Sequence, residues 1–229
     1  NRVIADPDYT ARLDHMLSED TAAKLAGMID PASAIPPSLP GGEAVHKDTV
    51  YITVVDKDRM CVSMIYSIFH SFGSGMASDK FGILFQNRGG GFTLDEGHPN
   101  EAGGNKRPMH TIIPAMLTKG DAVQMSYGVM GADYQPQGQA HVLTSMVDYG
   151  MDIQGALDMP RVHSSPKTNG VQCEAGIPPL LRQGLQNLGH ALEIPDSAIG
   201  GGQGIWLHED TGFLSAGSDP RKDGQAAGF

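Results

Sequence analysis

The sequence has little cysteine, few basic residues and no long hydrophobic run. Only 2 of its 229 residues are cysteines, Cys61 and Cys173, and they lie far apart in the sequence. Cys61 falls in an expected strand, so it is expected to be a small core residue rather than half of a disulfide, and the redox compartment stays open. Aspartate and glutamate outnumber lysine and arginine by 26 to 16, which makes nucleic acid and anionic membranes poor partners. No segment approaches the roughly 18 apolar residues of a membrane-spanning helix.

The sequence also lacks the residue spacing of a metal site. Its 9 histidines include no pair placed as on a metal-binding helix, and there is no Cys-x-x-Cys motif, so we assign no metal and no cofactor. His110 and His141, taken alone, are more typical of surface or core positions than of catalysis. The glycine-rich residues 72–78 lack the lysine and the helix of a phosphate loop, and predict tight turns instead.

What remains is the composition of a globular protein. Hydrophobic residues make up 40% and charged residues 18% of the chain, enough for one sizeable core or two modest ones. The start at Asn1 has neither an initiator methionine nor a signal-peptide profile, so we expect an internal position of a longer protein; cytoplasmic and periplasmic locations both stay open. Residues 8–29 predict two short helices with Ser18 as a cap, and the prolines of residues 31–42 predict a flexible connector.

Alternating hairpins and helices predict a mixed α+β layered domain. The first hairpin is expected to have strands at residues 49–55 and 60–68 around a turn at 56–59. The second is expected at residues 112–117 and 123–129 around a turn at 119–121, with Pro114 marking an edge or a bulge. Further expected elements are helices at 141–149, 152–158 and 178–189, and strands from residue 82 and at 171–174, 205–207 and 213–216.

The first hairpin places two hydroxyl groups together. If Val55 lies opposite Met60, paired residues have numbers that sum to about 115, so Thr49 lies opposite Tyr66, within one residue, and Ser67 is a near neighbour. A hydroxyl at the start of a strand with a second hydroxyl beside it is what a threonine nucleophile requires, provided that a base is near. The alternative is that Thr49 is simply a good β-former.

The base for such a nucleophile is best supplied by Thr49 itself. No histidine or acid is obviously placed beside it, whereas an α-amine has an ordinary pKa of roughly 7.7–8.0 and suits a base at neutral pH. That amine exists only if the chain is cut between Asp48 and Thr49.

Two further stretches have the composition of a ligand site. Residues 82–92 include Gln-Asn-Arg and three glycines, which suits a pocket wall where backbone and ligand approach closely, or a simple bulge. Residues 130–138 pass from a strand to a helix through small residues, so consecutive backbone N–H groups can hold a developing oxyanion. An ordinary strand–helix connection is the alternative.

Ordered along the chain, several motifs resemble one family. Residues 49–229 resemble the small subunit of the gamma-glutamyltranspeptidase family, N-terminal nucleophile hydrolases that cut themselves to free a threonine, and residues 1–48 resemble the tail of the large subunit. The resemblance implies a four-layer αββα fold completed by a partner, the large subunit of the same precursor, and leaves a homodimer of the processed heterodimer open. It rests on Thr49 through Asp58, Phe72–Gly75, Gly82–Leu84, Asn105–Pro108, Pro160–Arg161 and Ser218–Arg221.

By position, the resemblance assigns roles to four residues. It implies Thr49 as the nucleophile, Ser67 as the hydroxyl that supports it, and Gly131 and Ala132 as donors of oxyanion-hole N–H groups. The Thr49 hydroxyl would attack the Asp48 carbonyl, and hydrolysis of the resulting ester would release the amine that then serves as base for other amides.

The substrate-binding positions depart from the transpeptidase pattern. Arg88 replaces a glutamine, residues 89–91 replace the stretch that carries a carboxylate, and Phe69 replaces an asparagine; His110 and Thr111 stand where paired serines bind substrate. Phe69, Arg88, Gly91, His110 and Thr111 are therefore the substrate-binding candidates.

An ammonium buried without its anion is unfavourable, and the pattern is more similar to a transpeptidase-like branch that includes cephalosporin acylases. We expect hydrolysis of a small-molecule amide, γ-glutamyl or another acyl amide. A true γ-glutamyl transferase or glutathione hydrolase, and a non-catalytic homologue used as a structural or binding subunit, are the alternatives.

Overall fold

The computed structural model describes residues 4–35, 49–164 and 170–229 and divides the chain into two compact units. The first unit comprises Asn1–Pro37 and Ile68–Thr111; the second comprises Ser38–Ser67 and Ile112–Phe229. Most of the expected connector, and Asp48 of the expected cleavage point, lie outside the described residues. The expected subunit boundary between residues 48 and 49 concerns a cut in the chain, and it stays a prediction.

The first unit contains two short helices and a series of turns. Helix α1 spans Leu13–Met16 and α2 spans Glu19–Gly27. The predicted cap is confirmed, because the Ser18 side chain accepts a hydrogen bond from the Thr21 N–H at 3.2 Å. This bond satisfies one of the free N–H groups at the start of α2.

The expected strand from residue 82 is wrong. Leu84 makes only an isolated bridge to Ala77, and Gly82 at φ 63° takes the chain through a tight turn. The polypeptide then continues into a short 3₁₀ turn, η1, at Arg88–Gly91. The apolar run therefore forms a small local loop rather than a strand of a larger sheet, which composition alone does not distinguish.

The second unit is built on a four-stranded antiparallel sheet with the order β3-β4-β8-β9. Its strands are β3 (Ala115–Lys119), β4 (Ala122–Met130), β8 (Gly201–Leu207) and β9 (Leu214–Ser218). The predicted hairpin of β3 and β4 is confirmed, and the strands expected at 205–207 and 213–216 pair as β8 and β9. Pro114 directly precedes the edge strand β3, which contains a bulge between Leu117 and Thr118. Strand β8 begins four residues earlier than expected.

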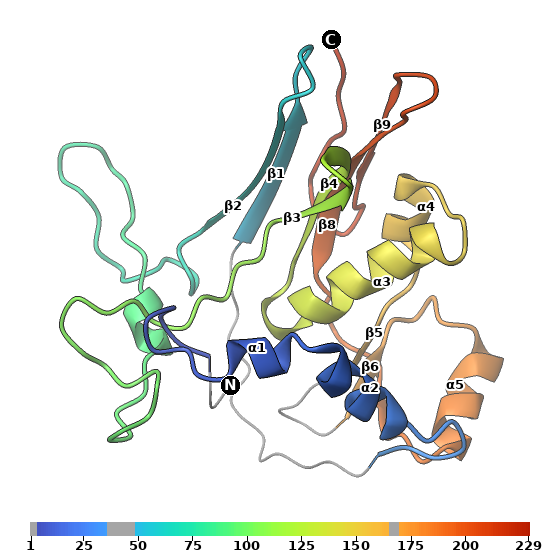
Figure 1. Cartoon of the computed structure of the whole chain (residues 1–229), viewed down its shortest axis with the longest axis horizontal. Helices are drawn as coiled ribbons and strands as arrows, with labels where there is room; N and C mark the ends of the chain where they lie inside the picture. Colours follow the sequence, from blue (N-terminus) through green and yellow to red (C-terminus); the bar gives the residue numbers. More distant parts are fainter. Residues whose placement is uncertain (1–3, 36–48, 165–169) are drawn as a thin grey trace. The chain divides into compact units, whose positions relative to one another are not determined.

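The two faces of this sheet have different partners (Figure 1). Helices α3 (Gln135–Val147) and α4 (Ile153–Asp158) cover one face, where Met125 and Val129 of β4 pack with Val142 and Leu157 in the main apolar core. The hairpin of β1 (Thr49–Val55) and β2 (Cys61–Ser67) lies on the other face. The second unit thus contains β, β and α layers in that order.

Smaller elements complete the second unit. A three-stranded sheet has the order β5-β6-β7, with β5 at Val162–Ser164, β6 at Val171–Cys173 and β7 at Leu192–Glu193; helix α5 spans Pro179–Asn187. Strands β5 and β7 were not predicted, because they are too short to show a period. Helix α3 begins at Gln135, six residues before its expected start, with Pro136 in its first turn.

Candidate functional site

Thr49 and Ser67 face each other at the open end of the first hairpin. The register pairs Thr49 with Ser67 and Val55 with Cys61. The expected register paired Thr49 with Tyr66, within one residue, and the observed shift of one residue arises because Met60 belongs to the turn. On opposite positions of an antiparallel pair the two side chains share a face. The Thr49 hydroxyl accordingly donates a hydrogen bond to Ser67 Oγ at 3.1 Å.

Hydroxyl groups also attach the inner face of the hairpin to the sheet. Thr53 Oγ1 donates to Ser126 Oγ of β4 at 2.7 Å and Ser63 Oγ donates to the Tyr127 carbonyl of β4 at 3.4 Å. Within the hairpin, the Tyr51 hydroxyl lies 2.7 Å from Ser63 Oγ. Burial raises the pKa of Tyr51, so this phenol stays neutral. A Cβ at residue 128 would lie 2.3 Å from the Tyr51 ring, so Gly128 is what allows β1 to pack this closely on β4.

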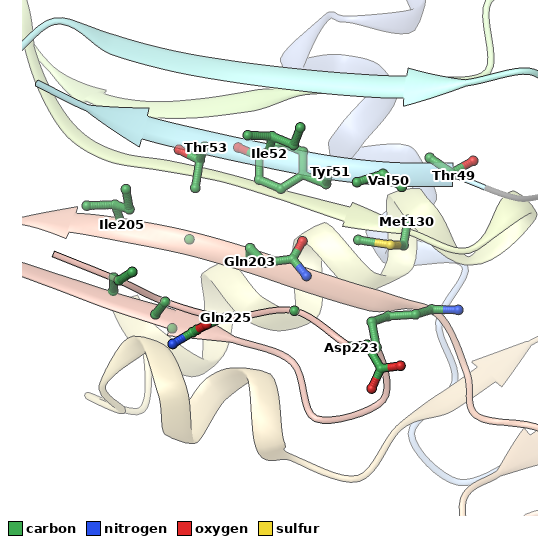
Figure 2. A pocket seen from close by; sticks show the side chains of 17 residues that line it. Thr49, Val50, Tyr51, Ile52, Thr53, Met130, Gln203, Ile205, Asp223 and Gln225 are labelled. Atoms are coloured by element: carbon green, nitrogen blue, oxygen red, sulfur yellow. The ribbon is translucent and has the colours of Figure 1, made fainter. Parts of the chain in front are cut away.

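A cavity of about 510 Å³ runs along the inner side of β1 from Thr49. Figure 2 shows the labelled residues of β1 on one wall, with Gln203 and Ile205 of β8 and Asp223 and Gln225 of the C-terminal segment on the other. Met130, the last residue of β4, lies at the same end as Thr49 (Figure 2). The turn that follows Met130 therefore begins at the Thr49 end of the cavity.

The turn after Met130 has the geometry of an N–H donor site. Gly131 has φ 133° and Ala132 has φ 51°, and a Cβ at residue 131 would lie 2.7 Å from Gly200 Cα, so only glycine fits there. Among the described residues, neither the Gly131 nor the Ala132 N–H donates a hydrogen bond to another part of the protein. Two consecutive N–H groups without an acceptor are what an oxyanion hole requires, and the role of Gly131 and Ala132 as its donors stays a prediction.

A buried ion pair holds the segment that supports this turn. Arg161 and Asp219 are almost completely buried, and their side chains form a short ion pair. Arg161 Nη1 donates to the Ile199 carbonyl at 2.7 Å, and Asp219 accepts from the Gly202 N–H at 3.0 Å. The residues around Gly200, against which Gly131 packs, are thereby fixed from both sides.

A second ion pair extends this arrangement. Arg221 lies 2.6 Å from Glu174 and 3.1 Å from Asp219. Burial alone would raise the pKa of Glu174, but the hydrogen bonds from Arg221 and from the Arg161 and Ile199 N–H groups together lower it. The sequence motifs that contain Arg161, Asp219 and Arg221 supported only the family resemblance, and nothing in their spacing indicated this shared role.

Four of the five substrate-binding candidates lie together in the first unit. Arg88 Nη1 donates to Thr111 Oγ1 at 2.8 Å, and Arg88 Cζ lies 5.5 Å from the centre of the Phe69 ring. A Cβ at Gly91 would lie 3.9 Å from Phe69 Cζ, so residue 91 borders the same ring. His110 is exposed and directly precedes Thr111 in the chain.

Metal-binding side-chain clusters and membrane-spanning helices are not found in the parts of the chain that the structure describes. No cluster of three or more histidine, cysteine, aspartate or glutamate side chains there is arranged to hold a metal ion. None of the helices there combines the length and the apolar character that crossing a membrane requires.

Comparison with known proteins identifies the family. The gamma-glutamyltranspeptidase family matches the chain over residues 1–229. The chain belongs to this family. Among its relatives, the glutathione hydrolase-like YwrD proenzyme of Bacillus subtilis is 37% identical over 99% of the chain, and the oxamate amidohydrolase proenzyme of Klebsiella pneumoniae is 35% identical over 99%. The chain covers 44% of each of these two relatives, and so less than half of their length.

Solved structures of the family agree with the observed fold. Cephalosporin acylase from Bacillus halodurans superimposes with a TM-score of 0.87 at 37% identity, over 99% of this chain and 41% of that one. Gamma-glutamyltranspeptidase from Pseudomonas nitroreducens gives a TM-score of 0.71 at 23% identity, over 78% of this chain and 98% of that one, and this likeness concerns the fold alone. The mixed α+β class and the family predicted from the sequence are confirmed.

Proposed function

We propose that the chain is part of an autoprocessing amidohydrolase with Thr49 as its nucleophile, and that it contains the tail of the large subunit at residues 1–48 and the small catalytic subunit at residues 49–229. The observation that carries this proposal is the hydrogen bond between Thr49 and Ser67 at the start of β1. The relatives named above are described as proenzymes, which supports a processing step.

In the first step the Thr49 hydroxyl adds to the Asp48 carbonyl carbon, and its proton moves to the departing Thr49 nitrogen. The C–N bond breaks as the ester forms, which frees the α-amine of Thr49, and hydrolysis of the ester by water then releases the Asp48 carboxylate and the Thr49 hydroxyl. With an ordinary pKa of roughly 7.7–8.0, that amine accepts a proton at neutral pH, whereas the original amide nitrogen does not.

In turnover the Thr49 amine takes the proton of the Thr49 hydroxyl as its oxygen attacks the amide carbon of a substrate. The proton passes to the leaving amine, and the acyl group stays on Thr49 until water hydrolyses it. The Gly131 and Ala132 N–H groups would stabilise the negative oxygen of each tetrahedral intermediate, a contribution typically worth about 2.7–4 kcal/mol for one donor.

We further propose that the rest of the precursor covers the outer face of the β1–β2 hairpin and completes a four-layer αββα sandwich. That face carries six large apolar side chains, each between 41% and 60% exposed: Val50, Ile52, Val54, Val62, Met64 and Tyr66. So large an apolar stripe is typical of a face that another part of the protein covers. Size-exclusion chromatography of the processed protein will show whether the heterodimer forms a homodimer.

The processing step is tested on the protein expressed from its full-length gene. Wild type is expected to yield a fragment that begins at Thr49 on mass spectrometry, Thr49→Ser to yield the same fragment more slowly, and Thr49→Ala to stay intact. Wild-type protein that stays intact after incubation contradicts the proposal.

An amide panel distinguishes the alternatives to a general amidohydrolase. Turnover of a γ-glutamyl anilide that is lost when the substrate amino group is blocked indicates a true transferase or glutathione hydrolase. Cleavage at Thr49 without turnover of any amide indicates a non-catalytic homologue with a structural or binding role.

A further inference from the structure

The burial of residues 4–35, here called the tail, is concentrated in one short segment. Among the described residues of the tail, only Ala5 and Asp6 are buried, and helices α1 and α2 contain no buried residue. A few buried residues usually carry most of the energy of a contact, because water is excluded from them. The attachment of the tail therefore depends mainly on residues 5 and 6.

Asp6 accepts hydrogen bonds from a segment of the first unit that is distant in the sequence. The Arg107 N–H donates to Asp6 Oδ2 at 2.8 Å, and Arg107 Nε lies 3.3 Å from the same oxygen. The side chain of Arg107 is 76% exposed and that of Asp6 only 4%, so water screens the ion pair and the backbone bond is the stronger contact. The Arg107 N–H also lowers the pKa of Asp6, which keeps this carboxylate charged at neutral pH.

Both sides of this contact are held in shape by hydrogen bonds of their own. In the tail, the Tyr9 and Thr10 N–H groups donate to the Asp6 carbonyl at 2.8 and 2.9 Å, which closes a turn. On the other side, the Met109 N–H donates to the side chain of the buried Asn100 at 2.8 Å. Two surfaces that already have their bound shape lose little conformational entropy when they bind.

The two segments lie on opposite sides of the proposed cut. Residues 4–10 precede Thr49 and residues 105–109 follow it, so cleavage would place them in different subunits. A second contact joins the same segments, because Lys106 Nζ lies 4.0 Å from the centre of the Tyr9 ring, a favourable position for a cation over an aromatic ring.

From this geometry we infer that Asp6 is the anchor by which the tail of the large subunit holds residues 105–109 of the small subunit after cleavage. The partner of residues 105–109 is thus a preformed acidic turn of the same precursor. This inference rests on the proposed function, since it requires the cut before Thr49.

Hydrogen exchange followed by mass spectrometry tests the anchor on the processed full-length protein. In Asp6→Ala, the peptides that contain residues 4–10 and 105–109 are expected to exchange at least about tenfold faster than in wild type, because amide hydrogens exchange when local contacts open. Asp8→Ala changes an exposed residue of the same turn and serves as the matched control, with exchange equal to wild type. Equal exchange in Asp6→Ala and wild type overturns the inference.

Release of the large subunit shows whether the anchor holds the two subunits together. At a urea concentration at which wild type separates slowly, size-exclusion chromatography should show release at least about tenfold faster in Asp6→Ala, since loss of a buried charged partner mainly raises the dissociation rate. Arg107→Gln keeps the backbone N–H and loses only the exposed ion pair, so its rate should stay within about twofold of wild type.

A second variant covers the case in which Asp6→Ala does not fold. Asp6→Asn keeps an acceptor oxygen but loses the charge, and it is expected to release the large subunit at least about threefold faster than wild type. A wild-type rate in the folded variant overturns the inference.

The outcome is separable from that of the proposed function. Protein that is never cut at Thr49 contradicts the proposed function, and faster exchange in uncut Asp6→Ala would still leave Asp6 as the anchor of the tail. Cleavage at Thr49 together with wild-type release rates in the folded Asp6 variants would overturn only the role of Asp6.

Discussion

At the scale of single residues, the placement of Thr49 beside Ser67 follows from the pairing register of one hairpin. Counting from a turn of known length gives that register to within one residue, so this pair could be predicted from the sequence. The contact of Arg88 with Thr111 joins residues 23 apart through turns, and turn conformations do not follow from a hydrophobic period. The Arg88 environment therefore needed the structure, although the sequence identified both residues as candidates.

Ser67→Ala is expected to slow both the cleavage at Thr49 and amide turnover by about three- to tenfold. The variant removes one neutral hydrogen bond to the nucleophile, and such bonds contribute about 0.5–1.5 kcal/mol. Mass spectrometry measures the cleavage and a spectrophotometric amide assay measures the turnover. Ser63→Ala removes a hydroxyl on the same strand that bonds Tyr51 instead and serves as the control; equal effects of the two variants would exclude a specific role for Ser67.

Gly131→Ala is expected to abolish detectable turnover. An added Cβ would meet Gly200 Cα at 2.7 Å in a conformation with φ 133°, so the turn must shift and its N–H groups with it. Backbone strain of this kind costs on the order of 1–3 kcal/mol. Ala132→Gly keeps both N–H groups and should retain turnover within about tenfold. Turnover in Gly131→Ala equal to wild type would remove this turn from the proposed mechanism.

At the scale of secondary-structure elements, the hairpins and the longer helices follow from local patterns, whereas their junctions do not. The sequence predicts the strands of β1 to β4, but the start of β8 depends on its pairing with β4 across a long stretch of chain. The strand expected from residue 82 is wrong because its apolar residues have no neighbouring strand to pair with, apart from the isolated bridge at Leu84. The buried face of a strand can be predicted from the sequence only where apolar and polar residues alternate along it.

The close packing of β1 on β4 is expected to fail in Gly128→Ala. The added methyl group would meet the Tyr51 ring at 2.3 Å, and overpacking of this kind typically costs about 1–3 kcal/mol. Differential scanning calorimetry should show a lower unfolding temperature and, because β1 carries Thr49, slower cleavage. Gly184→Ala, within α5 and with no atom near the added group, should be neutral or stabilising by up to about 1 kcal/mol. Equal unfolding temperatures for the two variants would contradict this packing argument.

At the scale of the whole molecule, buried charges connect segments that are far apart in the sequence. The ion pairs of Arg161 with Asp219 and of Arg221 with Glu174 join residues 58 and 47 positions apart. Such pairs arise only when the fold is complete, and no local pattern in the sequence reveals them. Their motifs are visible in the sequence because of the family resemblance, but their effect on the Gly131 turn is visible only in the structure.

The ion pair of Glu174 predicts how acid destabilises the second unit. The pKa of Glu174 is lowered from 4.5 on folding, so the unfolded chain binds more protons near that pH, and the contribution of the pair is fully present above about pH 4.5 and lost as the pH falls through the folded pKa. Glu174→Gln should therefore lower the free energy of unfolding by about 3 kcal/mol at pH 7, and the difference from wild type should shrink steadily below pH 4.5.

Thermal unfolding followed by circular dichroism between pH 3 and pH 7 measures this difference. Glu193→Gln, an exposed substitution on β7, is the matched control and should follow wild type to within about 0.5 kcal/mol, as surface substitutions usually do. A gap between wild type and Glu174→Gln that stays constant across the pH range would mean that the lost contact is not ionic, because only a titrating carboxylate gives a difference that disappears in acid.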